Sequence, residues 1–187
     1  MFKRLLLSRR SDFSVSTKQV WEFKRGDIMP ANAIFLSIRS QFVSKIFEGT
    51  KTVELRRIRP KHIAKGTLIL IYVPSPIQSL VGAFKVDRVV ELPPGELWKV
   101  VHDRAGVSRK EFDAYYEGTP TGVAIFFSDV WNLPEPIELQ DLKENVGFQP
   151  PQGFRYATAD ELSSPQLAEL VGGTETVIQS SFLIQKN

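Results

Sequence analysis

The amino-acid sequence predicts an α+β domain, a small mixed β-barrel with two or three short helices packed around it. Short apolar strands alternate irregularly with short helices, and no regular strand–helix–strand rhythm or internal repeat runs along the chain. A doubly wound parallel sheet requires that rhythm, so a small barrel or closed sheet with helical insertions is favoured. With 187 residues, the chain is long enough for one domain with a proper core.

The first strands and helix follow from simple apolar patterns. Residues 33–38 are short and apolar, which predicts a buried strand. Ser40 is expected to cap the start of a helix with an apolar stripe, and Gly49 to end it in a left-handed turn. Residues 51–57 form the next predicted strand, and the nearly continuous apolar run 67–73 predicts a central one.

A long strand over residues 79–92 leads into two predicted helices. Gly82 within this strand indicates a bend or a bulge. Pro93-Pro94-Gly95 opens the first helix. Ser108 and Glu111 form a capping box, in which side chains and backbone pair reciprocally, and this box starts the second helix.

The remainder of the chain is expected to be one strand, a loop and two short elements. Residues 121–130 form a strand that continues to Leu139 past two prolines. Residues 148–156 are rich in proline and aromatics and read as a loop. A short helix is expected within residues 159–171, and a last strand over residues 176–184.

The chain divides by charge into a basic extension and a body. Residues 1–31 carry seven Lys/Arg and three Asp/Glu without sustained periodicity, which predicts a flexible extension or an arm that touches nucleic acid. Its apolar run is too short for a secretion signal, and Met29 is a possible alternative start of translation. Residues 32–187 form the predicted single domain.

Composition excludes several functional classes. The chain has no cysteine and two histidines, so we expect no disulfide, no thiolate or histidine-rich metal site, and no cofactor. No apolar stretch approaches the roughly 18 residues of a membrane span. The protein is therefore expected in the cytoplasm, without a membrane partner. Motifs for a nucleophile elbow, a phosphate-binding loop or a zinc protease are also missing from the sequence.

The densest candidate site lies on the strand after Gly49. Residues 39–65 hold eight basic groups and two acidic ones, and among them Glu54 and Arg56 lie two apart on one strand face, with Lys51 at its mouth. Such a polar row can frame a ligand's hydrogen-bonding edge. It can equally be a solvated strand face with an ion pair, which contributes only about 0–1 kcal/mol.

Basic side chains continue into the following loop as Arg57, Arg59 and Lys61. Arginine forks suit phosphate and position nucleic acid without reading its sequence. A merely solubilising loop is the alternative.

Aromatic residues supply possible stacking surfaces for unpaired bases. Phe112 and one of Tyr115 and Tyr116 are expected in the core, since they recur at helical spacing. Arg155 and Tyr156 lie in the predicted loop, where an aromatic beside an arginine is less easily assigned to the core.

The ordered set of motifs resembles the ASCH family of PUA-like domains. The motifs are Ile34–Ile38 before the first helix, Gly49/Lys51/Glu54/Arg56, Gly66–Pro74, Val81–Val90, Trp98 with Gly106–Gly118, Gly122–Ile125 and Pro150–Tyr156. The resemblance covers about residues 33–156. It implies a PUA-like β-barrel with a cleft between barrel and helices. It also implies Lys51, Glu54 and Arg56 as cleft residues, with Tyr72 and Ser75 across from them.

The resemblance implies binding of RNA or a modified nucleoside, with DNA possible, in a role related to transcription or translation. Some relatives are amidohydrolases of an acetylated nucleoside, in which a lysine activates a threonine. Glu54 occupies that threonine's position and Ala105 that of a later glutamate, so the nucleophile is missing. Other relatives resemble ribonucleases, for which Lys51 and Glu54 would serve as acid and base. A protein–protein adaptor is the third alternative.

Overall fold

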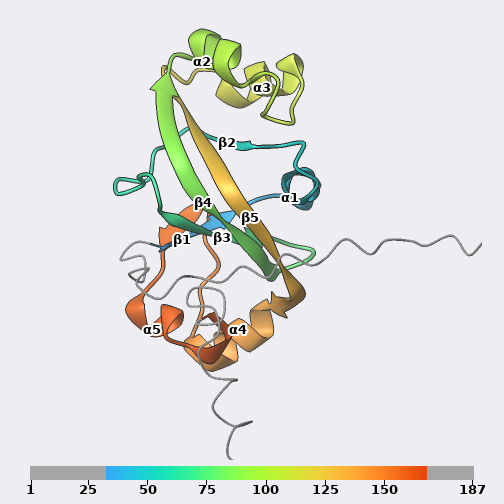
Figure 1. The fold of residues 1–187 in the computed structure, drawn as a ribbon, viewed down its shortest axis with the longest axis vertical. Helices are drawn as coiled ribbons and strands as arrows, with labels where there is room; N and C mark the ends of the chain where they lie inside the picture. Colours follow the sequence, from blue (N-terminus) through green and yellow to red (C-terminus); the bar gives the residue numbers. More distant parts are fainter. Residues whose placement is uncertain (1–32, 168–187) are drawn as a thin grey trace, which may run out of the picture.

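A single curled sheet dominates the computed structural model, which describes residues 33–167 (Figure 1). Its spatial strand order is β2-β5-β4-β3-β1-β6, which leaves β2 and β6 at the edges within the described part of the chain. The strands are β1 (Ala33–Ser37), β2 (Val53–Arg56), β3 (Leu68–Val73), β4 (Ser79–Leu92), β5 (Gly122–Glu138) and β6 (Phe154–Tyr156).

The long strands β4 and β5 form the central ribbon of the sheet. They pair antiparallel along most of their length, and register shifts near Gly82, Lys85 and Arg88 break the ladder. β1 pairs parallel with β3, and the other neighbours are antiparallel. These bulges strengthen the twist, so the sheet curls into a half-barrel, consistent with a PUA-like α+β fold.

The helices α1 to α5 lie around this sheet in the described part of the chain. Figure 1 shows α2 and α3 at one end of the β4–β5 ribbon, α4 and α5 at the other, and α1 beside β2. Their bounds are α1 (Ser40–Phe47), α2 (Pro94–Val101), α3 (Arg109–Tyr116), α4 (Leu139–Val146) and α5 (Ala159–Leu162).

Three apolar clusters hold these layers together. The first packs α1 against one face of the sheet, through residues such as Ile34, Ile46 and Phe84. The second packs α4 and α5 against the opposite face of β1 and β3, through the alternate residues of these strands. The third packs α2 and α3 against β2 and β5, with Phe112 and Tyr116 at its centre.

Most predicted elements are confirmed. The predicted 79–92 strand coincides with β4, and its register shift falls at Gly82 as expected. The capping box of Ser108 and Glu111 starts α3. Strand β5 runs through both of its prolines to Glu138.

Three expectations at the level of elements are wrong. The cap of α1 is Arg39, without a side-chain cap bond, and Ser40 is already helical. No helix was predicted for residues 139–146, which form α4 on Leu139, Leu142 and Val146. The expected loop over 148–156 ends in β6, which pairs with β1.

Two further expectations fall outside the described residues. These are the flexible extension over residues 1–31 and the last strand over residues 176–184. The predicted helix within 159–171 is confirmed as α5, which ends at Leu162.

Candidate functional site

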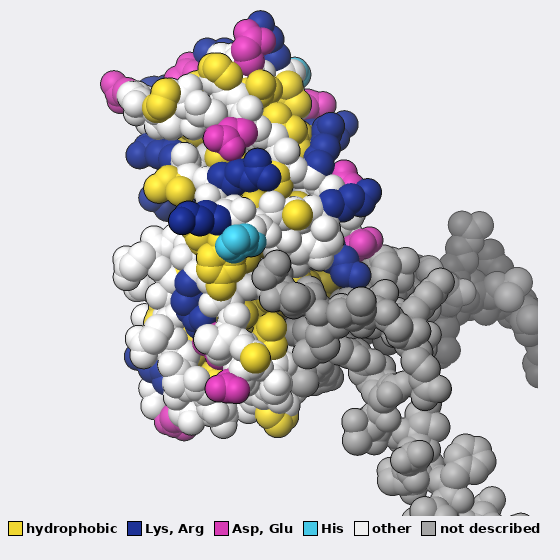
Figure 2. All heavy atoms as spheres, turned by 90° about the vertical axis from the view of Figure 1, so that its left-hand side faces the viewer, with side chains coloured by type: hydrophobic (Ala, Val, Ile, Leu, Met, Phe, Trp, Pro, Cys, Tyr) yellow, Lys and Arg dark blue, Asp and Glu magenta, His cyan; other side chains and the backbone are white. Residues whose placement is uncertain are grey.

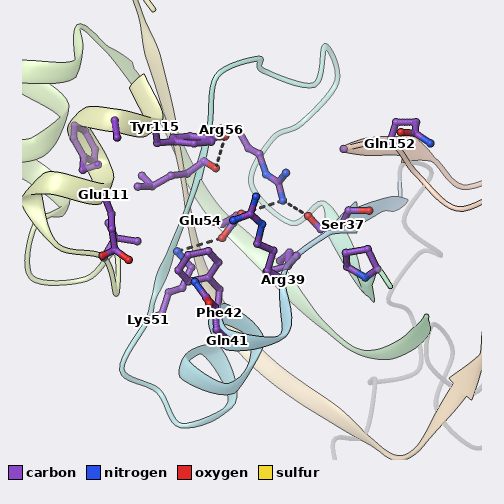
Figure 3. Close-up of a pocket in the computed structure, with 17 residues that line it drawn as sticks. Ser37, Arg39, Gln41, Phe42, Lys51, Glu54, Arg56, Glu111, Tyr115 and Gln152 are labelled. Carbon is purple, nitrogen blue, oxygen red and sulfur yellow. Dashed lines mark hydrogen bonds and ion pairs between the residues drawn. The ribbon is translucent and has the colours of Figure 1, made fainter. Parts of the chain in front are cut away.

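A cavity of about 640 Å³ opens where β1, α1, β2 and α3 meet. β2 forms its floor with Glu54 and Arg56, and α3 supplies a wall that includes Tyr115. In Figure 3, α3 lies on one side of these floor residues, and the β1–α1 connection with Arg39 lies on another. The lining therefore combines charged groups with a ring surface, as small-ligand sites do.

The floor of the cavity is a three-residue charge cluster. Glu54 Oε2 lies 3.2 Å from Lys51 Nζ, and Glu54 Oε1 lies 3.0 Å from Arg56 Nη2. Their side chains are only 2% exposed for Lys51, 9% for Glu54 and 15% for Arg56. One buried carboxylate thus lies between two cations, and the cluster keeps one net positive charge. This burial differs from the solvated strand face that was the alternative.

Lys51 is held by the turn before β2. Gly49 adopts the left-handed conformation with φ of 76°, and the Lys51 amide donates to Lys45 O. The Lys51 ammonium donates to Ala105 O at 2.8 Å in addition to its ion pair with Glu54. Burial lowers the pKa of Lys51 below 10.5, although the Glu54 carboxylate opposes the shift.

Gly106 allows the α2–α3 connection to lie close to Lys45 and Lys51, because it has no side chain. Gly106 has a φ of 66°, and a Cβ there would lie 3.2 Å from carbons of both Lys45 and Lys51. Lys45 Nζ donates to Gly106 O at 2.5 Å. The two lysines therefore fasten this connection to α1 and β2, and they place α3 at the cavity.

Arg56 joins β2 to β1 across the cavity. Its Nη2 donates to Ser37 O at 2.7 Å while also facing Glu54. The Nε atom of Arg56 is buried and has no hydrogen-bond partner among the described residues. The guanidinium is thus fixed in place with part of its donor capacity unused.

The aromatic surface of the cavity comes from α3 and α1. Tyr115 is 37% exposed, and its hydroxyl donates to Leu55 O at 3.4 Å. The Arg57 guanidinium lies 4.7 Å from the centre of this ring. The centre of the Phe42 ring on α1 lies 5.4 Å from Lys51 Nζ. Phe112 and Tyr116 are core residues, so the expectation that one of the two tyrosines is buried is confirmed.

Glu111 lines the cavity at the start of α3. Its Oε2 accepts bonds from the amide and the hydroxyl of Ser108, and these bonds lower its pKa. The carboxylate is therefore engaged in capping the helix while it faces the hollow.

The structure gathers three of the sequence-predicted site residues into this cavity, namely Lys51, Glu54 and Arg56. Arg57 lies at its edge against Tyr115, where Nε donates to Tyr115 O. Arg59 and Lys61 lie farther along the β2–β3 loop and are exposed. Figure 2 shows Lys and Arg side chains gathered across the middle of one face of the molecule.

Four other predicted site residues do not line the cavity. Tyr72 is 2% exposed and packs on Phe148 in the core. Pro74, rather than the neighbouring Ser75, reaches the lining. Arg155 is sandwiched between Phe35 and Phe148 at 4.5 and 4.6 Å.

Arg155 also pairs with Glu161, so it joins β6 to α5. Tyr156 is half-exposed and contacts His62 of the β2–β3 loop. Whether any of these side chains binds a ligand remains a prediction, and they have no part in the cavity described above.

Sequence reasoning left out several lining residues. Helical spacing does not show which of Tyr115 and Tyr116 faces a ligand, and Phe42 lies in the apolar stripe of α1. Arg39 was counted as a basic group, although its place directly after a buried strand could have marked it. Gln41, Glu111 and Gln152 also line the cavity. Gln152 reaches it from the segment before β6, and no local pattern indicates that placement.

Two structural features are missing from residues 33–167, a metal-ligating cluster and a membrane-spanning helix. No group of three His, Asp or Glu side chains in this part of the chain could hold a metal ion. Likewise, none of the helices described here has the length and apolar character needed to cross a membrane.

Comparison with known proteins identifies the family. The model for the ASCH domain matches residues 36–140, more than half of the chain. The chain belongs to the ASCH domain family. The matched range contains the whole of α1, β2 and α3, and therefore most of the cavity.

Individual ASCH relatives agree with this assignment. An ASCH domain-containing ribonuclease from Zymomonas mobilis is 32% identical over 136 residues, 72% of this chain and 90% of its own length. A crystal structure of ASCH from Zymomonas mobilis matches with a TM-score of 0.64 and 32% identity, over 69% of this chain and 90% of that one. A variant of that protein gives a TM-score of 0.68 at 30% identity, over 76% and 99% of the two chains.

Proposed function

We propose that this ASCH protein binds single-stranded RNA, with one unpaired base held in the cavity beside Glu54 and Tyr115. The observation that carries the proposal is the buried Lys51–Glu54–Arg56 cluster, which faces a hollow with an exposed tyrosine ring. A base can stack on Tyr115 while its polar edge meets the carboxylate and the guanidinium. The similarity to a protein named as a ribonuclease supports RNA as the ligand class.

The β2–β3 loop extends the proposed interface. Arg57 lies against Tyr115, and Arg59 and Lys61 follow on the exposed loop. Arg59 is 3.7 Å from Glu91, with both side chains 44% exposed, so water screens this pair and leaves Arg59 able to meet phosphate. These side chains would hold the RNA backbone without reading sequence.

The binding test compares two tyrosines of equal exposure. Tyr115 lines the cavity and Tyr156 does not, although each is 37% exposed. Fluorescence anisotropy with a labelled single-stranded RNA octamer measures the Kd of wild type, Tyr115→Ala and Tyr156→Ala. Loss of one stacked base costs roughly 1–3 kcal/mol, so Tyr115→Ala should weaken binding by about 5- to 150-fold.

Tyr156→Ala should weaken binding much less than Tyr115→Ala, because Tyr156 contacts His62 of the β2–β3 loop and does not line the cavity. Equal weakening by both variants, or no binding of the octamer by the wild type at low salt, would refute the proposal. An octamer of DNA with the same sequence, measured in parallel, shows whether the 2′-hydroxyl contributes. A role of such binding in transcription or translation stays a prediction of the family resemblance.

A second candidate function is RNA cleavage in the same cavity, and the Lys51–Glu54 pair favours it. Glu54 would take the proton of a 2′-hydroxyl while the 2′-oxygen attacks the neighbouring phosphorus. Lys51 would give a proton to the departing 5′-oxygen, which leaves a 2′,3′-cyclic phosphate. The lowered pKa of Lys51 makes its ammonium a better acid than an exposed lysine.

Cleavage is measured by electrophoresis of labelled RNA after incubation with the wild type, Lys51→Met and Glu54→Gln, each checked for folding by circular dichroism. Product from the wild type alone would establish this second function. Product from a folded Lys51→Met variant at the wild-type rate would exclude it.

The amidohydrolase alternative finds less support in the geometry. Glu54 stands at the position of the expected hydroxyl nucleophile. Ser37 brings a hydroxyl to the lining, but its Oγ donates to Pro151 O at 2.7 Å. Asp103, which lies near the position of the later glutamate, is 61% exposed and does not line the cavity.

A further inference from the structure

Arg39 is a cation of the cavity whose charge is not met by a carboxylate. Lys51 and Arg56 share Glu54, and Glu111 caps α3 through Ser108. Arg39 lines the same cavity from the β1–α1 connection, and its guanidinium has no ion pair or hydrogen bond within the described residues 33–167. A positive charge is therefore left over at this end of the hollow.

Arg56 and the start of α1 lie with Arg39 in the lining of the cavity. Only Nη2 of Arg56 is bonded, and Nε has no partner within the described chain. The helix α1 begins at Ser40 without a side-chain cap and without an acidic residue in its first turn. The Arg39 carbonyl accepts from the amides of Phe42 and Val43, but no side chain caps the amides before them. Gln41 of this turn lines the cavity.

We propose that the Arg39 end of the cavity holds a phosphate group of the ligand. The phosphate would lie beside the guanidinium groups of Arg39 and Arg56, while the base of the same nucleotide lies against Tyr115. Arginine forks match phosphate oxygens with paired donors, and the start of α1 adds favourable dipoles. This inference rests on the proposed RNA binding, and it makes a phosphorylated nucleotide the ligand in preference to a free nucleoside.

The inference separates two ligand classes that the family resemblance left open. A free nucleoside has no phosphate to meet the charge of Arg39, whereas each nucleotide of an RNA strand carries one. The phosphate contact is the same for all four bases, so it does not depend on the identity of the base.

The test uses Arg39→Gln in the full chain, with Arg104→Gln as the matched control. Arg104 is also an arginine, is 53% exposed and does not line the cavity. Both substitutions remove one positive charge, and neither removes a buried contact. Anisotropy with the labelled RNA octamer at several salt concentrations gives the Kd and the slope of log Kd against log salt.

Arg39→Gln should weaken binding about tenfold and reduce the magnitude of the salt slope by about 0.7, the value for one phosphate contact on a single strand. Arg104→Gln should change the Kd and the salt slope by much less. In a second arm, calorimetry compares the four ribonucleosides with their 5′- and 3′-monophosphates. The preference for monophosphates should be lost in Arg39→Gln.

The outcomes separate this inference from the proposed function. If the wild type binds the octamer through Tyr115 but Arg39→Gln behaves like Arg104→Gln, the phosphate site is refuted and RNA binding stands. Equal affinity of the wild type for nucleosides and monophosphates refutes it in the same way. If the wild type does not bind the octamer at all, both the function and this inference fail.

Discussion

At the scale of single residues, Glu54 is the group on which the cavity depends. It is 7% exposed and is the carboxylate that both Lys51 and Arg56 contact. Two buried cations without an anion between them would repel each other in a medium that screens poorly. Glu54 therefore maintains the geometry of the floor as well as offering oxygens to a ligand.

Glu54→Gln should accordingly destabilise the protein strongly. Breaking a buried ion pair typically costs about 3–5 kcal/mol, and loss of a proton by Lys51 would relieve part of that cost. Urea unfolding at pH 7 measures the change in the free energy of unfolding. The control is Glu91→Gln, whose partner Arg59 is 44% exposed, and which should change stability by less than about 1 kcal/mol. Similar changes in the two variants would contradict the buried cluster.

Lys51 should also make the stability depend on pH in a defined direction. Burial lowers its pKa in the folded state, whereas the unfolded chain keeps the ordinary value of 10.5. Between the two values the unfolded chain binds more protons, so the free energy of unfolding rises with pH in this window. Below the lowered pKa both states are protonated, and the cost of burying the charge is present in full.

The measurement compares urea unfolding of the wild type and Lys51→Met from pH 7 to 10.5. The other titratable groups are the same in both proteins, so the difference between the two curves reports on Lys51. Wild-type stability should increase relative to the variant as pH approaches 10.5. A constant difference across this range would mean that the Lys51 ammonium is not disfavoured by burial.

At the scale of elements, the bulge in β4 requires a glycine. A Cβ at Gly82 would collide with Trp131 O and lie 2.9 Å from Asn132 Cα on β5. Both are backbone atoms, so the strands themselves would have to move. We expect Gly82→Ala to cost about 1–3 kcal/mol, measured by thermal or urea unfolding.

Gly95→Ala is the matched control for this prediction. Gly95 lies in the first turn of α2, and a Cβ there meets no atom within 4 Å. Alanine should be neutral or stabilise by up to about 1 kcal/mol, because it restricts the unfolded chain. A Gly82→Ala protein as stable as Gly95→Ala would show that β4 and β5 do not approach this closely.

Elements with strong local signals could be predicted from the sequence. The capping box of Ser108 and Glu111 marks α3, because the pairing involves residues only three apart. Strand β6 could not be predicted, because its three residues become a strand only by pairing with β1, more than one hundred residues earlier. Arg39 caps α1 without a side-chain bond, so the preference for serine at that position was misleading.

At the scale of the whole molecule, the cavity is assembled from distant parts of the chain. The β1–α1 connection, β2, α3 and the segment before β6 each contribute to its lining. The charged residues of β2 could be found in the sequence because they are close together. The contributions of Tyr115 and Gln152 could not, because they depend on how the half-barrel brings α3 and the segment before β6 to the same cavity.

The distribution of charge over the molecule agrees with this arrangement. Residues 39–65 carry eight basic groups and two acidic ones, and they supply the start of α1, β2 and the β2–β3 loop. Basic side chains therefore lie both inside the cavity and on the loop beside it. This surface would attract an anionic strand, and added salt would weaken the attraction.

The most direct test of RNA binding in the cavity is an amide NMR titration of the full chain with an unlabelled single-stranded RNA octamer. The account predicts that the largest chemical-shift changes fall on backbone amides of lining residues, Arg39, Leu55, Tyr115 and Gly153 among them. Smaller changes should follow along the β2–β3 loop. Shift changes confined to residues outside the cavity and this loop, with the lining amides unmoved, would contradict it.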